Sequence, residues 1–271
     1  MAAIDLTRLK QQIAGLVDSY LDPPVFQARL HALLDCYHRY SHRKQRDSIP
    51  STFMRVYDLP PQVIPQIEAG LKALPAANPS ATFALADHLW QDDYFEARDL
   101  AAFLLGKLPV TEEDALLEWI FARLQEPLDR AVAQALLSKA SATIQAQHPQ
   151  GWDNLIWRLL QEPDTRLNNF GLSALIQSIP QKSLAEFPTI YRSIRPFLQA
   201  SSDDLEVNLS RVVALLAQRS PEETAYLLKE VLADTSGRTL ERRVRSYLGF
   251  FEDDLKAGLQ TALNLHMRMS S

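Results

Sequence analysis

The sequence predicts an all-α protein made of repeated helix pairs, a right-handed α-α superhelix of the HEAT-like solenoid type with about five to six pairs. Three observations predict this fold class. Apolar residues recur at spacings of three and four along nearly the whole chain, no segment alternates strictly between apolar and polar residues, and one phrase returns about every 36 residues. The 271 residues are 46% hydrophobic, which is enough for a continuous core.

The repeated phrase starts with a leucine that closes one helix and then turns, through polar or proline residues, into a second helix. It occurs at Leu89-Trp90-Gln91-Asp92, Leu124-Gln125-Glu126-Pro127, Leu160-Gln161-Glu162-Pro163, Leu198-Gln199-Ala200-Ser201 and Leu232-Ala233-Asp234-Thr235. The intervals between these leucines are 35, 36, 38 and 34 residues. One helix pair cannot bury its apolar face alone, whereas a stack of pairs can, so this period predicts a solenoid. The predicted second helices cover residues 97–105, 131–137, 167–176, 205–216 and 244–250.

Proline marks most of the breaks between the predicted helices. The chain has 16 prolines and only 8 glycines, and the prolines fall between apolar segments. We expect Pro23-Pro24 to end the first helix, because proline lacks an amide donor and clashes with the preceding turn. The phrase and the breaks together predict one continuous domain: an N-terminal helical cap over residues 1–50, a repeat array over 51–252, and a closing helix with a tail over 253–271.

Composition narrows the classes of function. The net charge of −5 argues against a protein coated in basic residues, although a local basic patch is compatible with it. The single cysteine, Cys36, excludes an internal disulfide and indicates a reducing compartment. Charge near the start of the chain and the lack of a long apolar run indicate neither a signal peptide nor a membrane span. We therefore expect a cytoplasmic protein that does not enter a membrane.

One early segment combines a proline turn with a Leu-Trp helix end. It reads Tyr57-Asp58-Leu59-Pro60-Pro61-Gln62-Val63, followed by Leu85-Ala86-Asp87-His88-Leu89-Trp90-Gln91-Asp92-Asp93-Tyr94-Phe95-Glu96-Ala97-Arg98. This combination resembles the DNA alkylation repair family of HEAT-like glycosylases, and Asp203 to Leu232 is similar to the penultimate repeat of that family. The resemblance covers residues 50 to 250. It implies a HEAT-like fold whose second helices form a concave face that receives DNA.

Active members of that family carry a tryptophan and an aspartate near the start of one second helix, and an arginine or another polar residue at the start of the next. The carboxylate stabilises the positive charge that develops as the alkylated base leaves. Aligning the helices places Glu126, Arg130 and Asn169 at these positions, with Asp129 one residue away from the aspartate position. One residue is a rotation of about 100° on a helix, so Asp129 substitutes only in another register. The resemblance therefore implies no catalytic residues here.

Arginines at repeat-related positions are candidate contacts to nucleic acid. Arg238, Arg242 and Arg245 are spaced four and three apart and so share one helix face. Arg130 and Arg166 each follow a repeat leucine by six residues, so a stacked array would align them. Solvated arginines paired with neighbouring glutamates explain the same residues equally well.

A second basic stretch lies near the end of the predicted cap. Between Tyr37 and Arg46, Arg43 and Lys44 stand among further cations and aromatic residues, a mixture that suits phosphates and stacked bases. Cations near the C-terminus of a helix also stabilise that helix by neutralising its carbonyl end, which is the other interpretation.

Other common sites are not indicated. Cys36, His38 and His42 are candidate metal ligands, because the two histidines are four residues apart and would share a helix face. No further cysteine pair and no acidic fourth ligand lies at a suitable distance in sequence. The chain contains no glycine-rich phosphate loop and no dinucleotide fingerprint. We expect neither a metal nor a cofactor.

Two hypotheses of different classes follow. The first is a divergent relative of the alkylation repair proteins that binds nucleic acid, expected to be duplex DNA, on a basic concave face with weak or no glycosylase activity. A retained alkylpurine DNA glycosylase is a second version of it. The competing hypothesis is a protein-interaction scaffold that holds a peptide or helix in its groove, which the acidic net charge favours.

Overall fold

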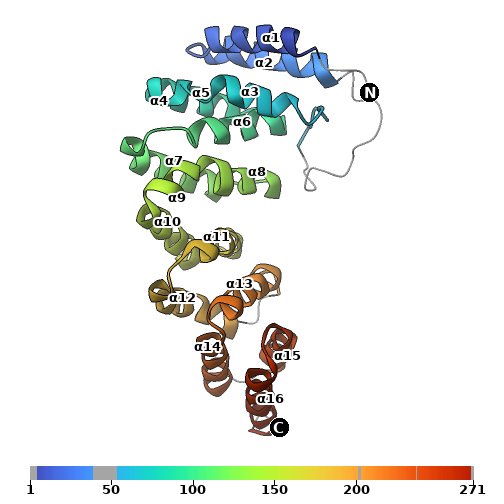
Figure 1. Ribbon diagram of the computed structural model, residues 1–271, viewed down its shortest axis with the longest axis vertical. Coiled ribbons are helices and arrows are strands. Elements are labelled where there is room, and N and C mark those ends of the chain that lie inside the picture. The colour runs from blue at the N-terminus through green and yellow to red at the C-terminus, as the bar shows by residue number, and fades with distance from the viewer. Residues whose placement is uncertain (1–4, 39–53, 201–202, 236, 270–271) are drawn as a thin grey trace. The chain divides into compact units, whose positions relative to one another are not determined.

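The computed structural model describes residues 5–38, 54–200, 203–235 and 237–269, and these ranges are helical almost throughout (Figure 1). Within them, extended pairing is limited to one isolated bridge between Arg55 and Tyr94. The all-α helical-repeat class predicted from the sequence is confirmed. Among the described helices, none combines the length and the apolarity that a membrane span requires.

Contacts divide the chain into two compact units, an N-terminal unit of residues 1–154 and a C-terminal unit of residues 155–271. The N-terminal unit contains α1 Leu6–Asp18, α2 Pro23–His38, α3 Val63–Leu71, α4 Leu74–Ala77, α5 Pro79–Trp90, α6 Phe95–Leu105, η1 Val110–Glu112, α7 Glu113–Gln125, α8 Arg130–Ala135, η2 Leu136–Ala140 and α9 Ala142–Gln147. Helix α5 packs against α6, and α6 packs against α8 and η2. This unit is therefore a stack of helix pairs.

The C-terminal unit repeats the same plan. It takes up α10 Pro149–Gln161, which begins just before the boundary, and continues with α11 Thr165–Ser178, η3 Ile179–Gln181, η4 Leu184–Glu186, α12 Phe187–Gln199, α13 Glu206–Arg219, α14 Pro221–Asp234, α15 Arg238–Tyr247, η5 Leu248–Phe250 and α16 Asp253–Met269. The first helices α12, α14 and α16 contact one another in order, as do the second helices α11, α13 and α15.

The leucine of each repeated phrase lies one or two residues before the end of a first helix. Each of these leucines is buried, and they close α5, α7, α10, α12 and α14 in turn, at Leu89, Leu124, Leu160, Leu198 and Leu232. Burying one leucine side chain stabilises the fold by about 1.5–3 kcal/mol. The phrase recurs because each helix pair needs this anchor at the same place.

Proline acts differently at one expected break. Helix α1 ends at Asp18, and Pro23 begins α2. The prediction that Pro23-Pro24 ends the first helix was therefore wrong. In the first turn of a helix the missing amide proton of proline would have no partner anyway, and its fixed φ suits the helix. Pro79, Pro149 and Pro221 begin α5, α10 and α14 in the same way.

The Leu-Trp segment that carries the family resemblance joins α2 to the turn between α5 and α6. The buried carboxylate of Asp92 accepts hydrogen bonds from the Tyr94 N–H at 2.9 Å, from His31 Nε2 at 2.7 Å and from Gln27 Nε2 at 2.5 Å. Arg98 donates from Nε to the Asp92 carbonyl at 2.9 Å. One carboxylate therefore fixes a helix end and a neighbouring helix together.

Two tyrosines extend this network to the segment before α3. The Tyr57 N–H donates to Glu96 Oε1 at 2.9 Å, and the Tyr57 ring stacks on Tyr94 with centroids 4.3 Å apart. His31 donates to Asp92 through Nε2, so its Nδ1 accepts the phenol proton of Tyr57 at 2.6 Å. Burial raises the pKa of Tyr57, which keeps that proton in place. The residues of the resemblance thus have structural roles within the N-terminal unit.

A close backbone approach fixes α6 against η2. A Cβ on Gly106 would lie 1.8 Å from the carbonyl oxygen of Lys139. The Lys139 ammonium in turn donates to Glu68 at 2.9 Å and to Asp99 at 2.6 Å. Only glycine allows the two backbones to meet at this distance.

The first prediction tests that approach. Gly106→Ala should lower the free energy of unfolding by about 1–3 kcal/mol or more, because the added methyl group must push backbone aside. Gly249→Ala is the matched control, since a Cβ there meets no atom within 4 Å. Urea unfolding followed by circular dichroism measures both variants. Equal stability of the two variants would contradict the close contact.

The second prediction concerns Asp92. Burial alone would raise the pKa of Asp92, but the hydrogen bonds from Gln27, Tyr94 and His31 outweigh burial and lower it. The ionised carboxylate therefore stabilises the fold above the unfolded pKa of about 3.8, and this contribution is lost as the pH falls through the lower folded pKa.

We expect Asp92→Asn to reduce the free energy of unfolding by about 2 kcal/mol at neutral pH. The difference from the original chain should shrink below about pH 4, where the carboxylate begins to bind a proton. Denaturant titrations across this pH range provide the measurement. Asp93→Asn, at the exposed neighbouring position, should change little at any pH. A deficit for Asp92→Asn that does not depend on pH would refute the assigned role of the charge.

Candidate functional site

Positive charge gathers on the second helices of the C-terminal unit. Helices α11, α13 and α15 carry two glutamates, no aspartate, no lysine and seven arginines, namely Arg166, Arg211, Arg219, Arg238, Arg242, Arg243 and Arg245. The first helices α12 and α14 of the same unit carry three cations and four anions. The second helices are therefore basic in a chain whose net charge is −5.

Two of the seven arginines hold the fold together. Arg243 is 3% exposed, pairs with Glu206, and donates through Nη1 to three carbonyls at the end of α12, at 2.8 to 3.1 Å. Arg219 donates to the carbonyls of residues 179, 180 and 182 at 2.8 to 2.9 Å. The last carbonyls of a helix lack partners within it, so these guanidinium groups supply them. Both guanidinium groups therefore have structural roles.

Helix α15 presents its other arginines to solvent. Arg238, Arg242 and Arg245 are exposed, while Leu240 and Val244 on the opposite side are buried. Arg242 pairs with Asp203 at 3.2 Å, but both side chains are about three quarters exposed, at 74% and 75%. Such a pair contributes little to stability and yields readily to another anion. The arginine spacing thus forms one exposed basic face.

The other predicted contacts have different settings. Arg166 lies in the first turn of α11, half-buried, and pairs with Asp164 at 3.2 Å. Arg130 is the first residue of α8 and is exposed, but it belongs to the N-terminal unit. The shared offset of six residues therefore places each arginine at the start of a second helix, in two separate units. Arg43 and Lys44 lie outside the described residues.

Arg211 was missed by the sequence analysis. It is exposed on α13, on the same stripe as exposed Val207 and Gln218. Its distance in sequence from the repeat leucine differs from that of Arg166, so an alignment on equal offsets passes over it. The signal that finds it is helical spacing, because Val207, Arg211 and Gln218 avoid the positions of the buried residues of α13.

The positions that correspond to the glycosylase residues of the resembled family make structural contacts. Glu126 accepts hydrogen bonds from the indole of Trp90 at 3.2 Å and from Arg123 at 2.6 Å. Asn169 accepts through Oδ1 from the buried Asn208 side chain at 2.7 Å, which ties α11 to α13. These contacts occupy the two side chains with packing between helices.

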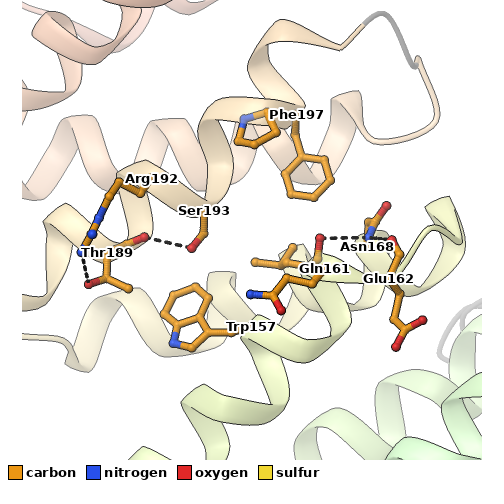
Figure 2. A pocket seen from close by; sticks show the side chains of 10 residues that line it. Trp157, Gln161, Glu162, Asn168, Thr189, Arg192, Ser193 and Phe197 are labelled. Carbon is orange, nitrogen blue, oxygen red and sulfur yellow. Dashed lines mark hydrogen bonds between the residues drawn. The ribbon is translucent and has the colours of Figure 1, made fainter.

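A cleft opens between the first helices α10 and α12 of the C-terminal unit (Figure 2). Its volume is about 590 Å³, and its walls come from Trp157, Leu160, Gln161, Glu162, Asn168, Thr189, Arg192, Ser193, Pro196 and Phe197. Trp157 and Phe197 are half-buried and line this cleft. The Trp157 ring is partly exposed because it lies in the gap between α10 and α12.

Polar groups of the cleft are partly engaged. Asn168 donates to three carbonyls at the end of α10, at 2.9 to 3.3 Å. Ser193 donates to the Thr189 carbonyl at 2.9 Å, and Arg192 donates to the Pro188 carbonyl and to the Thr189 hydroxyl, each at 3.3 Å. Pro196 has no N–H, so the Arg192 carbonyl lacks its helical donor.

Comparison with known proteins does not assign the chain to a family. No protein-family model matches the chain, and no curated protein matches it. The X-ray structure of YibA from E. coli is 14% identical over 73% of this chain and 85% of that chain, with a TM-score of 0.27. The crystal structure of an engineered protein is 14% identical over 87% of this chain and 98% of that chain, with a TM-score of 0.30. These similarities are too low to carry an argument about function.

Proposed function

We propose that this protein binds nucleic acid, with duplex DNA as the expected form, through the second helices of its C-terminal unit. The contact surface is the arginine face, defined as Arg166, Arg211, Arg238, Arg242 and Arg245. The observation that carries the proposal is the set of four exposed arginines on α13 and α15, Arg211, Arg238, Arg242 and Arg245, on helices that carry only two glutamates, one of which pairs with the buried Arg243. It refines the sequence-based hypothesis by adding Arg211 and by leaving Arg130 in the other unit.

The chemistry of arginine supports phosphate as the ligand. A guanidinium group offers five N–H donors in a planar fork that matches two phosphate oxygens, and it stays charged at any physiological pH. Neutralising phosphates also releases bound counterions, which drives association at low salt. The pair of Arg242 with Asp203 is about three quarters exposed on both sides, so a phosphate can replace this carboxylate.

Binding without efficient base excision is part of the proposal. The positions where the resembled family holds its tryptophan and arginine are Glu126 and Asn169, and both make contacts between helices. The aspartate position is Arg130, whose positive charge would oppose a cationic transition state. The aspartate position therefore holds no carboxylate that could stabilise a developing oxocarbenium ion.

The third prediction is a salt-dependent loss of DNA binding. Replacing Arg238, Arg242 and Arg245 together with glutamine should weaken binding of a labelled DNA duplex and flatten the plot of log affinity against log salt by about one unit per arginine. Fluorescence anisotropy between about 50 and 200 mM salt measures both quantities.

The control for this prediction removes equal charge elsewhere. Arg8, Lys10 and Lys72 are exposed cations of the N-terminal unit, and changing all three to glutamine leaves the arginine face intact. We expect the control to keep the salt slope of the original chain. The proposal fails if the original chain does not bind at low salt, or if the two triple variants bind alike.

The fourth prediction separates binding from chemistry. Incubated with DNA that carries methylated purines, the protein should release these bases no faster than the spontaneous rate, even at concentrations that saturate the DNA. Chromatography of released bases is the measurement. Release that depends on protein concentration would instead support the retained glycosylase.

A further inference from the structure

We propose that the cleft between α10 and α12 binds an amphipathic helix of a partner protein, lying antiparallel to both of them. The proposal does not depend on nucleic-acid binding, because the cleft and the arginine face use different side chains. It rests on three features of the cleft: apolar side chains on both of its walls, the opposite charges at its two ends, and the common direction of the two helices that form it.

Each wall of the cleft carries two apolar side chains that suit the buried side of a helix. Trp157 and Leu160 come from α10, and Pro196 and Phe197 come from α12. Figure 2 shows Trp157 on one wall and Phe197 on the opposite one. A helix would insert apolar side chains at positions i, i+3 or i+4, and i+7.

The charges at the ends of the cleft match the two ends of a helix. Arg192 lies at one end of the cleft and Glu162 at the other, with the aromatic rings between them (Figure 2). The N-terminus of a helix carries partial positive charge and free N–H groups, whereas its C-terminus carries partial negative charge and free carbonyls. Glu162 is therefore suited to the N-terminus of a bound helix, and Arg192 to its C-terminus.

The directions of α10 and α12 select the same orientation. The labelled side chains advance the same way along both helices, from Trp157 to Gln161 on α10 and from Thr189 to Phe197 on α12 (Figure 2). The C-terminal halves of both helices thus lie toward the Glu162 end. A bound helix that runs antiparallel places its positive N-terminus at that end, where helix dipoles and carboxylate attract it together.

Hydrogen-bonding capacity remains at both ends. Arg192 uses two of its N–H groups within α12, so the others can reach the final carbonyls of a bound helix. The carboxylate of Glu162 accepts no hydrogen bond from the part of the chain that the structure describes, and is open to N–H donors. One arginine and one glutamate give no net attraction for a polyanion, which favours a protein helix over nucleic acid at this site.

The fifth prediction uses a displayed peptide library as the probe. Its members are helical, with leucine fixed at i, i+3, i+4 and i+7 and with the remaining positions varied, and they are selected on the full chain. Selected peptides should bind Trp157→Ala and Glu162→Lys about tenfold or more weakly than the original chain, as measured by anisotropy. Glu162→Lys changes a surface side chain, so it tests the cleft even where Trp157→Ala fails to fold.

Matched variants control for side-chain type. Trp119→Ala removes a half-exposed tryptophan of the N-terminal unit, and Glu222→Lys reverses an exposed charge on α14. Both should bind the peptides as the original chain does. The triple glutamine variant of Arg238, Arg242 and Arg245 should also keep peptide binding, while Trp157→Ala should keep DNA binding, so the two proposals fail separately.

The orientation has its own readout. A photo-crosslinker at the peptide N-terminus should attach near Glu162, and one at the C-terminus near Arg192, with the sites mapped by mass spectrometry. Reversed attachment overturns the antiparallel arrangement. Selection that yields no binder, or binders equally strong on Trp157→Ala and Glu162→Lys, overturns the docking site.

Discussion

Each helix of this chain has an apolar stripe that it cannot bury alone, and the rest of the structure depends on the way neighbouring helix pairs cover one another's stripes. The buried leucine near the end of α5, α7, α10, α12 and α14 is common to this arrangement, and Leu89 in one unit and Leu198 in the other are both fully buried. A stack built this way leaves one side of each second helix and the gaps between first helices free for other uses. Both proposed sites lie in those places.

Stacking also buries helix ends whose last carbonyl groups have no hydrogen-bond donor within the helix. Polar side chains from neighbouring helices or turns donate to these carbonyl groups. Asn168 serves the end of α10, Arg243 serves the end of α12, and Arg219 serves the turn after α11. In the C-terminal unit arginine thus has two different roles. Buried arginines close helix ends, whereas exposed arginines on the same helices carry the charge that we propose meets phosphate.

The Leu-Trp segment, which resembles a glycosylase family, consists of residues whose role in this structure is to pack helices together. Asp92 and Glu96 were read as part of a family pattern, yet their carboxylates receive hydrogen bonds from α2 and from the segment at Tyr57. A short polar turn between paired helices needs such acceptors whatever the protein binds. A resemblance that rests on these residues therefore indicates the fold of the helix pair and does not indicate the catalytic activity.

The helical class, the repeat period and the ends of the first helices followed from the sequence by itself, because apolar spacing and buried leucines are local properties of each helix. The exposed arginines of α15 followed for the same reason, since three residues at spacings of four and three share a face wherever the helix packs. The separate roles of Arg243 and Arg242 did not follow. Helical spacing puts Arg243 on the buried side of α15 with Leu240 and Tyr247, but only the packing of α12 supplies the carbonyl groups that it binds. The cleft at Trp157 was equally hidden, because a gap between α10 and α12 depends on how far apart successive helices pack, and no residue of either helix encodes that distance alone.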